Sequence, residues 1–271
     1  MKSELVQKAY EIAKERYAAM GVDTEKVLEQ MQDFHLSLHC WQADDVKGFE
    51  VQAGELTGGI QATGNYPGAA RNIDELRADI VKAKSYIPGT HRLNLHEIYG
   101  DFKGKVVDRD EVTPEYFESW IEWAKENNMK LDFNSTSFSH PKSGNLSLAN
   151  PDEGIRNFWI EHTKRCREIS EAMGKAQGDP CIMNLWVHDG SKDQTVNKYL
   201  YRSLLKDSLD KIFATKYDNM KDCIESKVFG IGLESFTVGS NDFYTAYAAQ
   251  NNKLITLDTG HFHPTERGAD Q

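Results

Sequence analysis

The chain has 271 residues, 39% of them hydrophobic, and a formal net charge of −10 at pH 7. This length is enough for one large domain with a substantial core. No run of 18 apolar residues occurs, so no membrane-spanning helix is expected. The acidic balance argues against a nucleic-acid partner, because phosphate binding needs a basic surface. The N-terminus lacks the apolar segment of a signal peptide, which predicts a cytoplasmic protein without membrane association.

The four cysteines, Cys40, Cys166, Cys181 and Cys223, are scattered along the chain and form no C-x-x-C pair. In a chain without a secretion signal, this pattern is typical of reduced thiols. Three of them fall at apolar strand or helix positions, where a free thiol packs as a small hydrophobic group. We therefore expect mostly buried, unpaired cysteines.

Two helices are predicted first, over residues 3–20 and over residues 24–33, the second starting near Thr24. Short strands with alternating side chains then alternate with helices. The predicted strands are His35–Trp41, Arg92–His96, Leu131–Asn134, Cys181–Val187, Ile224–Val228 and Leu254–Asp258. The predicted helices are Asn72–Ser85, Thr113–Asn127, Pro151–Met173, Thr195–Tyr217 and Ser240–Gln250, with Asn72 or Asp74, Thr113 and Asn150 as candidate N-caps.

The alternation of strands and helices predicts a parallel sheet with crossover helices. One face of the predicted strands is apolar, and the other carries polar side chains on all six strands. A (β/α) barrel presents its site in this way, at the carboxyl ends of the strands. The alternative, a doubly wound open sheet, would bury both faces under helices and fits the polar face poorly.

We count six strand–helix units, whereas a closed barrel has about eight strands. The sequence therefore predicts an α/β protein of the TIM (β/α)8-barrel class that is incomplete here. We expect a single domain over residues 1–271 that lacks the last two units. Residues 1–34 form an N-terminal helical extension in this interpretation, and residues 35–271 form the partial barrel.

A glycine-rich stretch, Val51–Ala70, follows the first predicted strand at the functional rim. Two interpretations stay open for it: a lid that closes over a substrate, or a surface loop without a role. It is not a phosphate-binding loop, because no Lys-Ser/Thr pair follows its glycines.

Four residues near the C-terminal end predict a site for a divalent metal. Glu225 and Lys227 share one strand face, Asp258 ends the next strand, and His261 lies on the turn that follows. Neighbouring parallel strands are about 4.8 Å apart, so Glu225 and Asp258 could share one ion while His261 reaches a second. Carboxylate and imidazole ligands suit Mn²⁺, Mg²⁺, Co²⁺ or Zn²⁺. The alternative is that Glu225 and Lys227 pair with charges inside the barrel.

Aromatic side chains accompany this polar face. Trp41 and Trp186 point inward from their strands, and Phe138 lies just past the third strand. Aromatic rings stack on the C–H face of a sugar, while His96 and Asn184 can hydrogen-bond its hydroxyls. The set favours a polyol pocket, although each aromatic residue taken alone is more typical of barrel-filling core.

At this point the chain resembles the L-rhamnose isomerase family over essentially all residues up to Glu266. The resemblance rests on long and unusual strings rather than on a short motif. These are Leu38–Gln42 with Asp44 and Asp45, Leu56–Gly68, Glu75–Asp79, Arg92–His96, Phe138–Pro141, Met183–Trp186, Glu225–Gly232, Thr237–Asn241 and Leu257–Glu266.

The resemblance implies a cytoplasmic, metal-dependent aldose–ketose isomerase on a (β/α)8 barrel, related to the xylose isomerases. Such an enzyme interconverts L-rhamnose and L-rhamnulose, usually with Mn²⁺ and usually as a homotetramer. It implies that Glu225 and Asp258 hold a structural metal and that His261 binds the catalytic metal. It further implies that Lys227 contacts the substrate near the reacting carbons. Trp41, His96, Phe138 and Trp186 are implied as pocket residues.

The chain departs from the family pattern at its end. The family's remaining ligands, a His, an Asp-x-Asp pair and a further Asp, belong to the seventh and eighth strands and do not occur here. We therefore expect a truncated member with little or no activity alone. One alternative is a non-catalytic remnant that binds sugar or a subunit. Another is a different sugar isomerase or epimerase of the same superfamily.

Overall fold

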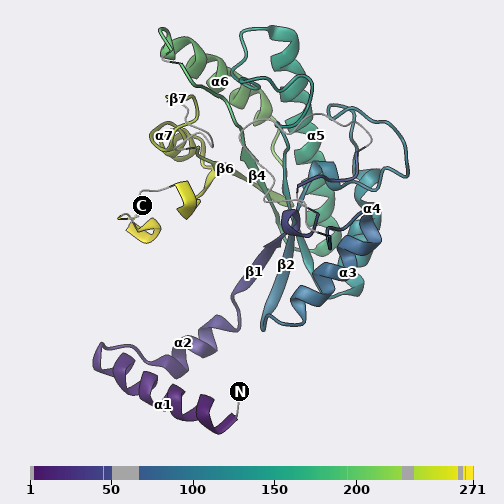
Figure 1. Cartoon of the computed structure of the whole chain (residues 1–271). Coiled ribbons are helices and arrows are strands. Elements are labelled where there is room, and N and C mark those ends of the chain that lie inside the picture. The colour runs from purple at the N-terminus through teal and green to yellow at the C-terminus, as the bar shows by residue number, and fades with distance from the viewer. Residues whose placement is uncertain are drawn as a thin grey trace.

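The fold is a curled parallel sheet with helices packed against it (Figure 1). The computed structural model describes residues 3–44, 46–50, 67–193, 195–227, 235–261, 265 and 267–270. The side chains of Gln42, His261 and Ala269 are not described. Most of the glycine-rich stretch Val51–Ala70 lies outside these ranges, so the lid interpretation stays a prediction.

The main sheet has six parallel strands in the order β1-β2-β3-β4-β6-β8. Its neighbouring strands follow one another along the chain without a reversal, which is the order of a barrel wall; a doubly wound sheet reverses its order at a switch point. The predicted incomplete (β/α) barrel is therefore confirmed. The strands are β1 (His35–His39), β2 (Thr90–His96), β3 (Lys130–Asn134), β4 (Cys181–Trp186), β6 (Met220–Glu225) and β8 (Leu254–Thr256).

Helices follow the strands as predicted, with shifted ends. Figure 1 shows α3, α4 and α5 along one side of the sheet, while α1 and α2 stand apart from it. The helices are α1 (Ser3–Ala19), α2 (Thr24–Met31), α3 (Ile73–Lys84), α4 (Glu118–Glu126), α5 (Glu153–Gln177), α6 (Lys198–Ile212) and α7 (Asn241–Asn251). Short 3₁₀ turns cover Cys40–Ala43, Glu97–Tyr99, Pro114–Phe117, Thr259–His261 and Gly268–Asp270.

Side-chain caps explain where several helices begin. Asn72 caps α3 by accepting a hydrogen bond from the backbone N–H of Glu75, as predicted. Helix α2 starts at Thr24, as predicted, and Asp23 caps it. One predicted cap is wrong, because Asp152 rather than Asn150 caps α5. In both helices the cap carboxylate accepts hydrogen bonds from N–H groups of the first turn.

The strand ends differ from the prediction at the functional rim. Trp41 does not extend β1 but lies in the 3₁₀ turn Cys40–Ala43. The fifth main-sheet strand begins earlier than predicted, at Met220, and ends at Glu225, so that Lys227 follows the strand. A small antiparallel pair was not predicted: β5 (Gly190–Ser191) with β7 (Phe236–Thr237).

The core lies between the sheet and its helices, mainly under α4 and α5. The central α5 buries Trp159, Ile169 and Met173 against the strands, and Trp120 of α4 lies beside it. The four cysteines are buried and unpaired, as predicted. Among the described residues, no helix is both long and apolar enough to span a membrane.

Candidate functional site

Polar side chains on the inner face of the sheet form hydrogen bonds from strand to strand. Near the carboxyl ends, Asn134 donates to Asn94 across β3 and β2. The side-chain amide of Asn184 in β4 donates to the Glu225 carboxylate at 2.5 Å, and the Thr256 hydroxyl donates to the Asn184 Oδ1 at 2.9 Å. The predicted shared polar face is therefore present, and Glu225 is held in place by the neighbouring strand.

The aromatic residues predicted for a sugar pocket meet at the carboxyl ends of β1 to β4. We call Trp41, His96, Phe138 and Trp186 the aromatic wall. Ring centroids are 4.4 Å apart for Trp41 and His96, 6.2 Å for Trp41 and Phe138, and 6.1 Å for Phe138 and Trp186. Phe138 stands in the middle and is 1% exposed. Four separate strand ends thus contribute to one surface.

The aromatic wall carries three buried polar atoms without a hydrogen-bond partner among the described residues. They are the indole N–H groups of Trp41 and Trp186 and the Nε2 of His96. A buried polar group without a partner costs about 1–3 kcal/mol, so such groups are rare unless a ligand or water completes them. Hydroxyl groups of a bound polyol would satisfy all three.

Burial holds the imidazole of His96 neutral. Its pKa lies well below the ordinary value, chiefly because the ring is desolvated and secondarily because His39 and Arg109 are near. Its Nδ1 lies 3.2 Å from the Thr136 hydroxyl. A neutral imidazole held in this way can donate a hydrogen bond to a ligand hydroxyl, or accept one from it, without adding a charge to the site.

The ammonium of Lys227 lies at the edge of the aromatic wall. The side chain is 1% exposed, and its Nζ lies 5.8 Å from the centroid of the Trp186 ring. Nζ also donates a hydrogen bond to the His188 carbonyl at 2.7 Å. β6 ends at Glu225, so Lys227 lies two residues past the strand, whereas it had been predicted to lie on the strand.

The predicted metal ligands lie on neighbouring strand ends. Glu225 pairs in register with Thr256, and Asp258 follows Thr256 by two residues. The Asp258 carboxylate accepts a hydrogen bond from the Gly260 N–H at 2.8 Å. No group of three or more potential metal-binding His, Cys, Asp or Glu side chains occurs within the described part of the chain. The His261 side chain lies outside it, so the metal site stays a prediction.

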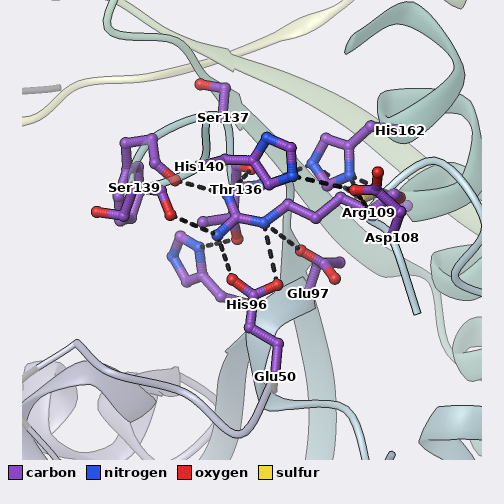
Figure 2. Close-up of polar contacts among 12 residues, drawn as sticks. Glu50, His96, Glu97, Asp108, Arg109, Thr136, Ser137, Ser139, His140 and His162 are labelled. Atoms are coloured by element: carbon purple, nitrogen blue, oxygen red, sulfur yellow. Dashed lines mark hydrogen bonds and ion pairs between the residues drawn. The ribbon is translucent and has the colours of Figure 1, made fainter. Parts of the chain in front are cut away.

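A buried ion-pair network behind the aromatic wall was not predicted. It centres on Arg109, which pairs with Glu50 and lies beside Glu97 (Figure 2). His140 and His162 are buried next to it. The charge run Asp108–Glu111 was the one local signal, and such runs are usually solvated.

Comparison with known proteins identifies the family of the chain. The model of the family "L-rhamnose isomerase (RhaA)" matches residues 4–271. A protein named L-rhamnose isomerase from Bacteroides thetaiotaomicron is 83% identical over 270 residues, which cover 100% of this chain and 65% of that protein.

Two more distant relatives with the same name show the same coverage. The protein from Rhodopirellula baltica is 53% identical over 98% of this chain and 63% of its own length. The protein from Mannheimia succiniciproducens is 55% identical over 98% of this chain and 64% of its own length. The chain thus spans somewhat less than two thirds of these relatives, and by family match and identity it belongs to the L-rhamnose isomerase family.

Proposed function

We propose that this chain supplies the sugar pocket and part of the metal site of an enzyme that interconverts L-rhamnose and L-rhamnulose. One observation carries the proposal. An aromatic wall with three buried, unpartnered polar atoms stands beside the buried ammonium of Lys227. This combination suits a ring or chain with C–H faces and several hydroxyls, which is the chemistry of a sugar.

The proposed roles follow from the character of each side chain. Trp41, Phe138 and Trp186 would pack on the C–H surface of the sugar and exclude water. The indole N–H groups would donate to sugar oxygens, and His96 would hold one hydroxyl through Nε2. Aldose–ketose isomerisation moves a hydrogen between C2 and C1 and develops negative charge on the two attached oxygens. A buried ammonium stabilises such charge more strongly than a solvated one, so we assign this role to Lys227.

The donor set fits a hard divalent cation. We propose that Glu225 and Asp258 hold one ion and that His261 contributes to a second, with Mn²⁺ as the first choice and Co²⁺, Mg²⁺ or Zn²⁺ as substitutes. Bound there, an ion would act as a Lewis acid on the sugar oxygens. The hydrogen bond from Asn184 to Glu225 would orient that carboxylate for the ion.

Activity of the 271-residue polypeptide alone is proposed to be weak. The proposed set contains two carboxylates and one imidazole for two ions, and octahedral Mn²⁺ prefers more oxygen ligands. We further propose a cytoplasmic enzyme that works as a homo-oligomer, as in the family that the chain resembles.

The test is an isomerase assay on two polypeptides with added Mn²⁺ and L-rhamnose. One is the 271-residue chain. The other joins it to the part of the Bacteroides thetaiotaomicron relative that it does not cover, which the 83% identity makes a conservative chimera. We expect turnover by the chimera at least about 100-fold above that of the short chain. We expect Lys227→Met in the chimera to lower kcat by about 100-fold, an effect typical of losing one transition-state contact.

Two outcomes would contradict the proposal. One is a chimera that turns over L-rhamnose equally well with Lys227→Met. The other is a short chain that is as active as the chimera, which would refute the weak-activity part alone.

A second candidate function is sugar binding without catalysis. The aromatic wall favours it, because ring stacking and hydrogen bonds hold a sugar without any metal. Binding of L-rhamnose by a chimera without turnover would support this function.

A further inference from the structure

Arg109 connects the aromatic wall to a buried charge network that no substrate contact explains. The side chain is 1% exposed and lies between the turn that follows β3 and two acidic residues, Glu50 and Glu97 (Figure 2). Residues from three separate stretches of sequence thus converge on the Arg109 guanidinium. Burying these charged groups together costs free energy, because each charge must be removed from water.

The guanidinium donates hydrogen bonds to three backbone carbonyls in the turn after β3. Its Nη1 donates to the carbonyls of Thr136 and Phe138 at 2.8 and 2.6 Å. Its Nη2 donates to the Ser139 carbonyl at 3.3 Å. Only the planar fork of an arginine offers five N–H groups in this arrangement.

The turn that Arg109 holds is strained. Ser139 has a φ of 55°, in the left-handed region that non-glycine residues rarely adopt. A second support comes from His162, whose Nε2 accepts a hydrogen bond from the Thr136 N–H at 3.0 Å. The backbone around Phe138 is therefore fixed from outside the pocket.

Charge balance keeps Arg109 in place. Glu50 binds the guanidinium through both carboxylate oxygens. The Nε of Arg109 also lies 3.7 Å from a carboxylate oxygen of Glu97. Both oxygens of Glu97 are buried without a hydrogen-bond partner among the described residues, and burial raises the pKa of this carboxyl well above its usual range. One guanidinium is thus flanked by two acids and directed by them onto the turn.

We propose that Arg109 is a positioning residue that sets the aromatic wall, by clamping the Thr136–Ser139 turn so that Phe138 stands between Trp41 and Trp186. The Phe138 ring packs in a small apolar cluster with Val46 and Trp186, against which Trp41 lies. The consequence for the sugar rests on the proposed function. The position of Phe138 would then determine how well the apolar face of the sugar fits.

The experiment uses 5-fluorotryptophan and ¹⁹F NMR on the full chain, whose five tryptophans give five lines. Single Trp→Phe variants assign the lines. In Arg109→Lys, which keeps the charge but loses the fork, we expect the Trp41 and Trp186 lines to move while the Trp120 and Trp123 lines stay. Phe138→Ala should move the same two lines.

Arg167→Lys is the matched control. Arg167 is an equally buried arginine that binds Asp222 and the carbonyls of Ile212 and Thr215, away from the wall. We expect it to leave the Trp41 and Trp186 lines in place. The proposal is overturned if these lines stay in Arg109→Lys, or if they move equally in Arg167→Lys. Should Arg109→Lys fail to fold, Arg109→Lys/Ser139→Gly relieves the left-handed residue and supplies a folded background.

Titration with L-rhamnose separates this inference from the proposed function. We expect affinity to fall by about tenfold in Arg109→Lys, which corresponds to about 1.4 kcal/mol. If the lines move but neither protein binds L-rhamnose, the proposed function fails and the positioning role stands. If the wild-type chain binds L-rhamnose and the lines do not move, the positioning role fails alone.

Discussion

His162 shows how burial fixes the chemistry of a single side chain. Its Nε2 accepts from the Thr136 N–H at 3.0 Å, so the proton sits on Nδ1, which donates to the Arg109 carbonyl at 3.1 Å. Both ring nitrogens are thus used by the neutral form. Desolvation, followed by the nearby positive charge of Arg109, lowers the pKa of His162 to about 3. Protonation would break the bond from Thr136.

This arrangement predicts a loss of stability in acid. An unfolded histidine takes a proton near pH 6.5, whereas folded His162 does so only near pH 3. Between these values the unfolded chain binds more protons, so the free energy of unfolding falls as pH falls. We expect His162→Gln to reduce the slope of this fall by up to about 1.4 kcal/mol per pH unit. Urea unfolding at pH 4.5, 5.5 and 7 measures it.

The control is His35→Gln, because His35 lies exposed at the start of β1. It should leave the slope unchanged. Equal slopes in His162→Gln and the wild-type chain would refute the assignment. Other groups near His162, namely Asp108, Arg109 and His140, are present in both proteins and so cancel in the comparison.

The same residues show what a sequence can predict at this scale. The members of the aromatic wall were found because each ends or follows a strand with a clear alternation, and parallel strand ends meet at one rim. Arg109 was missed because its partners are Glu50, 59 residues earlier, and Thr136, 27 residues later. Local sequence patterns do not indicate contacts between residues so far apart along the chain. The fold brings these residues together.

At the scale of elements, Asp132 joins four neighbouring strands on the inner face. Its carboxylate accepts two hydrogen bonds from Arg92 of β2 at 2.8 Å. It also accepts from the Ser37 hydroxyl of β1 at 2.8 Å and from the Ile182 N–H of β4 at 3.0 Å. Asp132 and Arg92 are both buried. A single side chain of β3 therefore links the first four of the six strands and supports their register.

Removing this carboxylate should be costly. We expect Asp132→Ala to lower the free energy of unfolding by about 3–5 kcal/mol, because the buried Arg92 charge loses its main partner. Urea denaturation followed by circular dichroism measures the change. Asp207→Ala, which removes an exposed pair with Lys211, should change stability by at most about 0.5 kcal/mol. A loss below about 1 kcal/mol in Asp132→Ala would contradict the bridging role.

Helix α5 approaches the sheet closely at one residue. A side chain at Gly174 would place its Cβ 1.6 Å from the Asn219 carbonyl oxygen and 3.1 Å from the Cys181 N–H nitrogen. These are backbone atoms at the starts of β6 and β4, so they cannot rotate away. The glycine thus sets the distance between α5 and the sheet.

We expect Gly174→Ala to destabilise the chain by at least about 1–3 kcal/mol through overpacking. Helix propensity alone predicts the opposite, a gain of about 1 kcal/mol. Thermal unfolding decides between the two. Lys175→Ala, at the exposed neighbouring position, should stay within about 0.5 kcal/mol of the wild-type chain. A more stable Gly174→Ala variant would show that α5 does not depend on this close approach.

Strand faces and helix order could be predicted at this scale, and element ends could not. The alternation of polar and apolar side chains identified the inner face on all six strands. This alternation is a local property of the sequence, because successive side chains of a strand point to opposite faces. Ends depend on tertiary contacts. β1 stops at His39 because Cys40–Ala43 turns into a 3₁₀ helix whose Trp41 packs on His96 and Phe138. The sequence alone gives no measure of that packing.

At the scale of the molecule, the core and the N-terminal helices behave differently. Every buried hydrophobic residue within the described ranges lies between Cys40 and Ala248, and α1 and α2 bury none. Figure 1 shows these two helices apart from the sheet. They contact each other through Tyr10 and Lys14, which both bind the Glu25 carboxylate at 2.9 Å. Such exposed polar contacts add little stability.

These helices also expose a large share of the apolar surface. Their unburied apolar side chains include Leu5, Ile12, Met20, Leu28 and Met31, each at least half exposed. Clusters of this kind on a monomer promote self-association. The cooperative unit that unfolds should therefore be the sheet with α3 to α7, without the N-terminal helices.

Deletion of residues 1–33 tests this division. We expect the melting temperature to change by less than about 2 °C, because α1 and α2 contain no buried residues. In a protein of this size, a loss of 1 kcal/mol in the free energy of unfolding lowers the melting temperature by about 2–4 °C. Binding of a hydrophobic dye at 20 °C should fall, since the deleted helices carry exposed apolar side chains. The double variant Leu28→Ser/Met31→Ser keeps both helices and should lower dye binding in the same direction. A drop of several degrees in the deletion variant would instead place α1 and α2 within the cooperative core.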